Sequence, residues 1–136
     1  MRLTPSGGFV PVNCSSARTA AALPVNSTAY QDLAVVPVNA DGGRPLLVLL
    51  SFLMKNDTTG ARTYTARMML NGSPVSEDLV CKLPKSVEAG ENLPYSFHFF
   101  ADALPPGNHS MSVQIKSDSA LPGQYMSERR ITVIEF

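Results

Sequence analysis

The sequence has few of the residues on which catalysis or nucleic-acid binding depends: no tryptophan, two cysteines, two histidines and little charge. Charged side chains make up 16% of the 136 residues, whereas a typical soluble protein has about a quarter. A surface with so few charges indicates that other chains cover part of it. The 11 basic and 11 acidic residues balance, so the basic excess that is typical of nucleic-acid-binding proteins is missing.

Signals for membrane insertion and export are missing as well. The apolar run Leu46–Met54 is too short to span a bilayer as a helix, and it contains Ser51. No continuous apolar stretch follows Arg2 at the N-terminus, so this segment does not read as a secretory signal peptide. We therefore expect a protein without a membrane partner that is assembled in a cytoplasm, with Cys14 and Cys81 as free thiols.

No motif for catalysis or metal binding occurs in the sequence. There is no H-E-x-x-H or C-x-x-C pair, no G-x-S-x-G elbow and no P-loop. A Cys-His nucleophile pair would have to be brought together by the fold, from Cys14 or Cys81 and one histidine. We expect instead that His98 is exposed or lies at an interface, and that His109 flanks a turn. The sequence thus predicts a protein that is not an enzyme, with no catalytic residue, cofactor or metal.

A series of short β-strands separated by turn residues fills most of the chain. The predicted strands are Tyr30–Val38, Leu46–Lys55, Arg62–Leu70, Val75–Leu83, Pro94–Phe100, His109–Lys116 and Arg130–Phe136. Several of them alternate between apolar and polar residues, as a half-buried strand does. About eight strands at this spacing, without a convincing long helix, predict an all-β fold, a single antiparallel β-sandwich or jelly roll.

The stretch Pro45–Val80 is the predicted centre of this fold. Turn residues at Asn56–Gly60 and at Asn71–Gly72 separate its strands, and Asn-Gly is a strong hairpin signal. The run Leu46–Leu50 does not alternate, which predicts that both faces of its strand are buried. Because one small sandwich has a single interior, we expect the second face to meet the N-terminal arm or another subunit.

Residues 1–28 are predicted to form an extended arm, and residues 29–136 the β-sandwich domain. Prolines and glycines interrupt the arm, and its alanine patch Thr19–Leu23 could form one or two helical turns. Such an arm is either disordered or ordered by a neighbour, and its isolated apolar residues favour ordering by a neighbour. The candidate interface residues are Phe9, Val10, Val12, Leu23, Val25, Leu46, Leu47, Val48, Leu49 and Leu50.

Two loop features are open to a binding role. Asn56–Gly60 together with Asp118–Ser119 could form a carbohydrate-binding surface, with Tyr125 as a loop aromatic in place of tryptophan. The acidic residues in or beside loops could bind calcium, but without EF-hand spacing solvated carboxylates are the expected state. These acidic residues are Asp41, Asp57, Glu77, Asp78 and Asp118.

Three stretches resemble small β-sandwich proteins of tailed-bacteriophage virions. They are Ala61–Arg67 leading to Leu70–Gly72, the segment Leu104–Lys116 with its Gly-x-His turn, and the terminal Arg129–Phe136. Similar segments occur in jelly-roll domains of phage fibres and capsid cement proteins. The resemblance implies a structural virion component that acts as an oligomer and brings no catalytic residue.

This chain departs from long fibre proteins because it has no repetitive shaft before the sandwich. The resemblance therefore points to a capsid decoration or cement protein on the capsid exterior, assembled in the host cytoplasm. Such a protein binds the lattice of the major capsid protein and stabilises the phage head, and we expect it to form a dimer or trimer. The alternative is a receptor-binding or tail-fibre tip module that recognises a host surface glycan.

Overall fold

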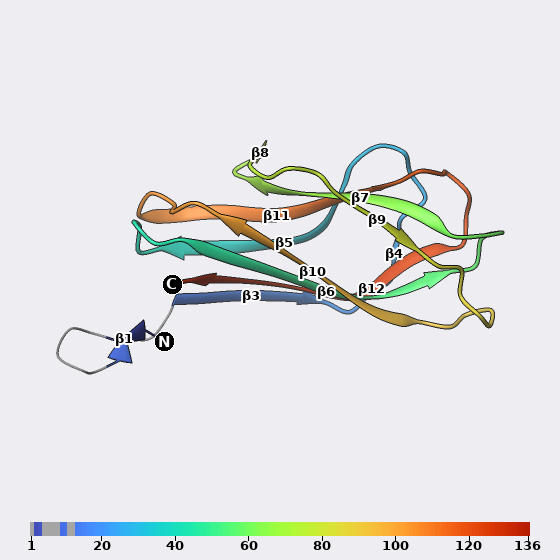
Figure 1. Ribbon diagram of the computed structural model, residues 1–136, viewed down its shortest axis with the longest axis horizontal. Helices are drawn as coiled ribbons and strands as arrows, with labels where there is room; N and C mark the ends of the chain where they lie inside the picture. The colour runs from blue at the N-terminus through green and yellow to red at the C-terminus, as the bar shows by residue number, and fades with distance from the viewer. Residues whose placement is uncertain (1, 4–8, 11–12) are drawn as a thin grey trace.

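The computed structural model describes residues 2–3, 9–10 and 13–136, with side chains from Asn13 onward, and the described residues form strands and no helix. Two antiparallel sheets pack face to face (Figure 1). Sheet I contains β3 (Asn13–Thr19), β4 (Leu23–Pro24), β6 (Leu46–Asn56), β10 (Leu93–Ala101) and β12 (Gln124–Glu135). Sheet II contains β5 (Gln31–Ala40), β7 (Arg62–Leu70), β8 (Ser73–Pro74), β9 (Leu79–Leu83) and β11 (Gly107–Ser117). A separate hairpin of β1 (Arg2–Leu3) and β2 (Phe9–Val10) lies beyond one end of the sandwich.

The strand order is that of a jelly roll. Sheet I has the order β10-β6-β12-β3, with β4 on the same edge of β12 as β3. Sheet II has the order β5-β11-β7, with β8 and β9 together on the far edge of β7. The chain crosses from one sheet to the other after β4, β5, β6, β9, β10 and β11, which is the winding of two Greek keys. The predicted all-β sandwich or jelly roll is confirmed.

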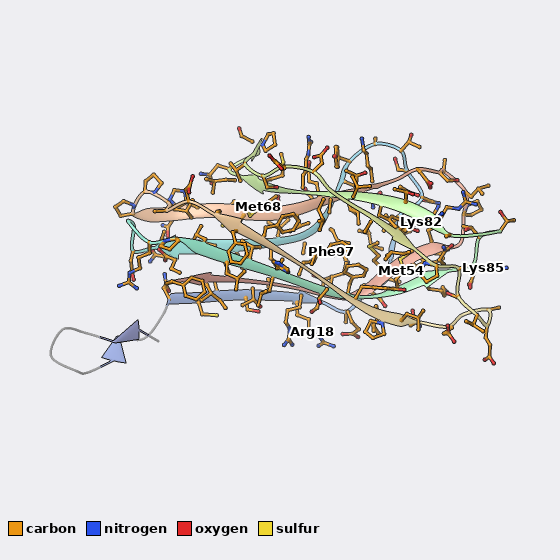
Figure 2. All side chains as sticks on the ribbon, viewed as in Figure 1. Arg18, Met54, Met68, Lys82, Lys85 and Phe97 are labelled. Carbon is orange, nitrogen blue, oxygen red and sulfur yellow. The ribbon has the colours of Figure 1, made fainter. Side chains whose placement is uncertain are left out.

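The core lies between the sheets and is filled by alternate residues of the facing strands. In β11, Met111, Val113 and Ile115 are fully buried while the residues between them are half-exposed. Figure 2 shows Met54, Met68 and Phe97 between the two layers and Arg18 outside them. The inward faces predicted for Arg62–Leu70, Pro94–Phe100 and His109–Lys116 are therefore correct.

The prediction that the run Leu46–Leu50 is buried on both faces is wrong within the single chain. Leu46, Val48 and Leu50 are buried in the core, whereas Leu47 is half-buried and Leu49 is 40% exposed. The strand keeps its period of two although every residue in the run is apolar. No described strand packs on the outer face of sheet I, so this face stays open among the described residues.

The expected arm is in large part an edge of sheet I. β3 pairs with β12 from Asn13↔Glu135 to Thr19↔Arg129, and β4 pairs with Tyr125 and Met126. The helical turns expected at Thr19–Leu23 do not form, because the backbone there stays extended or bends between β3 and β4. The neighbour that orders residues 13–24 is thus the last strand of the same chain. A division into arm and domain at residue 28 stays a prediction.

The start of the last strand also differs from expectation. β12 begins at Gln124, whereas the predicted strand begins at Arg130. A bulge with Glu128 at φ 49° lies in this strand, where the pairing with β6 shifts between Ser127 and Arg130. The positive φ and the interrupted ladder explain why the sequence looks like a loop here.

The Asn71-Gly72 turn has the geometry that its sequence predicts. Leu70 pairs with Ser73, so the hairpin loop has the two residues Asn71 and Gly72, at φ 48° and 85°. Positive φ at both positions is the type I′ turn, for which Asn-Gly is preferred.

A buried hydrogen-bond network holds the connection between β11 and β12. The Gln124 side-chain oxygen accepts hydrogen bonds from the Tyr64 hydroxyl at 2.7 Å and the Ser117 hydroxyl at 2.6 Å. Its amide nitrogen donates to the carbonyls of Ser119 and Leu121. Burial raises the pKa of the Tyr64 phenol, so the hydroxyl keeps its proton and acts as the donor.

Replacing Gln124 should be costly because two buried hydroxyls and two carbonyls would lose their partner at once. We expect Gln124→Ala to lower the free energy of unfolding by about 2–4 kcal/mol, measured by urea denaturation. Gln114→Ala is the matched control, since Gln114 bonds Arg67 and Asp32 on the outer face of sheet II, where water can replace it. A loss for Gln114→Ala equal to that for Gln124→Ala would contradict this role of the network.

Two N-terminal deletions should separate the hairpin from the edge strand. Deleting residues 2–12 removes β1 and β2, which pair only with each other. Deleting residues 2–24 also removes β3 and β4 and exposes the edge of β12. We expect the shorter deletion to leave the melting temperature nearly unchanged, and the longer one to lower it clearly, when both are followed by circular dichroism. Equal melting temperatures for the two variants would show that β3 contributes nothing to stability.

Candidate functional site

The predicted interface residues separate into three groups. Val25, Leu46, Val48 and Leu50 are buried in the core of the chain, where no partner can reach them, and Leu23 packs half-buried against that core. Leu47 and Leu49 lie on the outer face of sheet I. Phe9 and Val10 lie in the separate hairpin, and Val12 lies outside the described residues. The role of the set as an interface stays a prediction, and Leu47 and Leu49 are its members available on the sandwich.

The outer face of sheet I changes from apolar to polar along its strands. Cross-strand pairing places its residues in three rows. The first row is Phe100, Leu47, Ile134 and Cys14; the second is His98, Leu49, Thr132 and Ser16; the third is Ser96, Ser51, Arg130 and Arg18. The first two rows carry no acidic or permanently charged residue. They therefore form a surface that another chain could cover without desolvating an ion.

A shallow hollow of about 360 Å³ lies where the second and third rows meet. Its rim includes Leu49, His98 and Arg130. Arg18 is paired with Glu128, whereas Arg130 makes no ion pair with any described residue. The hollow has a hydrogen-bonding side and an apolar side, and among the described residues no hydrogen bond joins His98 to Ser51, Ser96 or Thr132.

A second apolar surface lies at the end of β10 and includes residues that sequence reasoning missed. Phe100 is 72% exposed, and Val75 and Phe136 are also exposed. All three line one hollow of about 480 Å³ together with Ala101 and Asp102. The signal was present in the sequence, because Phe99 and Phe100 are adjacent and adjacent residues of a strand point to opposite faces. With Phe99 buried, Phe100 has to point outward.

The two histidines have the structural surroundings that the sequence predicts. His98 is exposed on β10, and its ring packs edge-on against that of Phe100, with 5.7 Å between the ring centres. His109 Nε2 lies 2.8 Å from the Pro105 carbonyl and its Nδ1 lies 3.1 Å from the Asn71 side-chain amide. A carbonyl only accepts, so Nε2 carries the proton and Nδ1 accepts from Asn71. His109 thus ties the Asn71-Gly72 turn to the segment that precedes β11.

The two cysteines are free, as predicted. Cys14 is exposed on β3, whereas Cys81 is half-buried on β9 opposite Tyr64. Neither cysteine forms a hydrogen bond with a histidine in the described part of the chain. Burial raises the pKa of the Cys81 thiol, which leaves less of the reactive thiolate at neutral pH.

The two thiols should therefore differ in reactivity. At about pH 8 we expect iodoacetamide to modify Cys14 well before Cys81, since the thiolate is the reacting form. Raising the pH should accelerate the modification of Cys81, because its thiol loses its proton only at higher pH. Peptide mass spectrometry after timed labelling measures both rates, and the Cys14→Ser variant isolates the slow one. Equal rates at both sites would contradict the difference in burial.

Several side chains of the carbohydrate surface considered from the sequence are engaged within the protein, and the surface itself stays a prediction. The side chains of Asn56 and Thr58 are buried and bond each other and the Gly60 carbonyl. The Asp57 carboxylate accepts from the Gly90 amide. Tyr125 lies in β12, where the Lys55 ammonium sits 4.7 Å from the centre of its ring. Asn56, Asp57 and Thr58 thus hold loops together.

The acidic loop residues do not gather into a cation site. Across residues 13–136, no three His, Cys, Asp or Glu side chains come together in a way that could hold a metal ion. The stretch that the structure describes also has no helix long and apolar enough to cross a membrane.

The chain matches no protein-family model and no curated protein. It does resemble solved structures of a viral capsid protein. The VP2 subviral particle of infectious bursal disease virus aligns with a TM-score of 0.62 and 10% identity, over 90% of this chain and 32% of that one. T=1 particles derived from the same virus align with a TM-score of 0.59 and 11% identity, over 90% of this chain and 31% of that one. At this identity the likeness shows a shared jelly-roll fold. This chain spans about a third of the length of these two capsid chains.

Proposed function

We propose that this chain is a structural protein of a virus particle: a capsid decoration or cement protein that binds the lattice of the major capsid protein from the capsid exterior. The observation that carries the proposal is the outer face of sheet I, whose first two rows are uncharged and centred on Leu47 and Leu49. An extended apolar face without a catalytic group fits a role in assembly. In this role the protein associates with itself and with the capsid lattice.

The fold supports this proposal. The jelly roll that the chain shares with VP2 of infectious bursal disease virus is an architecture found in viral capsid proteins. The segments resembling tailed-phage virion proteins fall on β7, β11 and β12, which are central strands of the two sheets. Covering the outer face of sheet I would contribute on the order of 25 cal/mol for each Å² of apolar surface removed from water. Repeated over many copies, such contacts would hold a capsid against internal pressure.

The test is binding to particles of the major capsid protein encoded in the same genome. Co-expressed particles would be isolated by sedimentation, and the bound chain quantified. We expect the native chain to sediment with them. Leu49→Asp should reduce binding at least about tenfold, because a carboxylate buried in an apolar interface without a partner is strongly unfavourable.

Val35→Asp is the matched control. Val35 is 47% exposed, close to the 40% of Leu49, but lies on the outer face of sheet II. Both variants must first show native unfolding curves. An equal loss of particle binding for both variants would contradict the assignment of the outer face of sheet I as the binding face. No binding by the native chain would contradict the proposed capsid-binding function. Binding to host surface glycans without binding to capsids would favour the receptor-recognition alternative.

A further inference from the structure

The sandwich has four sheet edges, and three of them carry features that prevent pairing with another strand. β5 has Asp32, Pro37 and a bulge at Leu33, where its register with β11 shifts. β9 is only five residues long and carries Lys82. β3 carries Arg18. Charges, prolines, bulges and short length are the devices by which native proteins keep edge strands from associating.

The fourth edge, β10, has almost none of these devices. Its nine residues contain no Asp, Glu, Lys or Arg, and its one proline, Pro94, lies next to its start. It pairs with β6 from Leu93 to Ala101 without a register shift. No hydrogen bond from the described residues reaches its backbone from the side away from β6. A long, regular and uncharged edge strand is therefore left open.

The opposite side of the sandwich is closed by contrast. There β3 lies against β5, and side chains bridge the two sheets. Asn13 donates to the Asn39 carbonyl at 2.7 Å, and Arg129 donates to the Leu33 carbonyl at 2.8 Å. On the β10 side, an open groove of about 410 Å³ lies between Phe99 and Phe100 of β10 and the segment Val75–Leu79. The chain thus has one closed side and one open side.

We infer that β10 is a self-association edge: two copies of this chain pair through antiparallel β10 strands and join their two sheets I into one continuous sheet. This inference specifies the self-association contained in the proposed function and rests on it only for its biological purpose. The pairing itself is a property of the isolated protein.

The β10 strand of a second copy fits this edge better than the other edge strands of a second copy do. Pairing β10 with β3, β5 or β9 of a neighbour would set it against Arg18, against Asp32 and Pro37, or against Lys82. Pairing β10 with itself brings together two uncharged strands. This pairing also uses the one open edge of each copy. The assembly therefore closes as a two-fold dimer and does not grow into a filament.

The paired strands would place like faces side by side. In a full nine-residue overlap, His98 lies opposite Ser96 of the other copy, and both remain on the outer face. The exposed Phe100 of each copy would then lie across from Pro94 of the other, which covers part of its ring. Backbone hydrogen bonds supply the affinity in this mode. The absence of charge on β10 itself removes one barrier to pairing, although Glu77 and Asp78 line the neighbouring groove.

Charge placed on the edge tests the inference directly. Ser96→Lys/His98→Lys puts lysines opposite lysines across the pair, so we expect the dimer dissociation constant to rise at least about tenfold. Ser16→Lys is the control. Ser16 lies in the same row as His98 and Arg18 in the same row as Ser96, so this variant carries two cations at the matching positions of β3, on the far edge of sheet I. Sedimentation equilibrium over a wide concentration range measures each constant.

Mixing two variants of opposite charge distinguishes a loss of β10 pairing from a loss of folding. We expect Ser96→Glu/His98→Glu alone to be monomeric, and its equimolar mixture with the lysine variant to form a heterodimer. A native chain that stays monomeric overturns the inference, as does equal weakening by the β3 control, or failure of the mixture to associate when both variants are folded. These outcomes are independent of capsid binding, which the Leu49→Asp test measures.

Discussion

The structure depends on burying the inner face of sheet I against the inner face of sheet II. Each fully buried Leu, Ile, Val, Phe or Met contributes about 1.5–3 kcal/mol relative to an exposed side chain. The core residues Val48, Leu50, Val113, Ile115 and Ile131 all come from strands in the middle of the sheets. Because a strand has a period of two, this packing also determines which residues must face outward.

The outward residues carry the features that point to function. On β6, burial of Val48 and Leu50 forces Leu47 and Leu49 to the outside, although all four are apolar. On β10, burial of Phe99 forces Phe100 outward in the same way. On sheet I, the apolar outer surface is thus concentrated on β6, at the end of β10 and on Ile134 of β12. This concentration connects the proposed lattice-binding face with the proposed dimer edge, since both belong to sheet I.

Polar groups in this molecule mainly hold connections in place. Gln124 fastens the turn between β11 and β12, Asp57 bonds the Gly90 amide, and His109 ties Asn71 to Pro105. Two of these bonds, Asp57 with Gly90 and Asn71 with His109, join segments distant in sequence.

The sequence by itself determined the strands with clear alternation, the Asn71-Gly72 turn and the all-β class, because these depend on local periodicity and on backbone preferences of single residues. It also placed His98 outward and left both cysteines free. Only the tertiary structure decided that residues 13–24 form an edge of sheet I, because Cys14–Thr19 reads as polar and irregular until β12 supplies its hydrogen-bond partners. Likewise, an unbroken apolar run such as Leu46–Leu50 cannot reveal which of its faces is covered, since that depends on which strands the fold places against it. The open edge of β10 could not be predicted from the sequence for the same reason. Whether a strand has one neighbour or two depends on the order of the strands in the sheet.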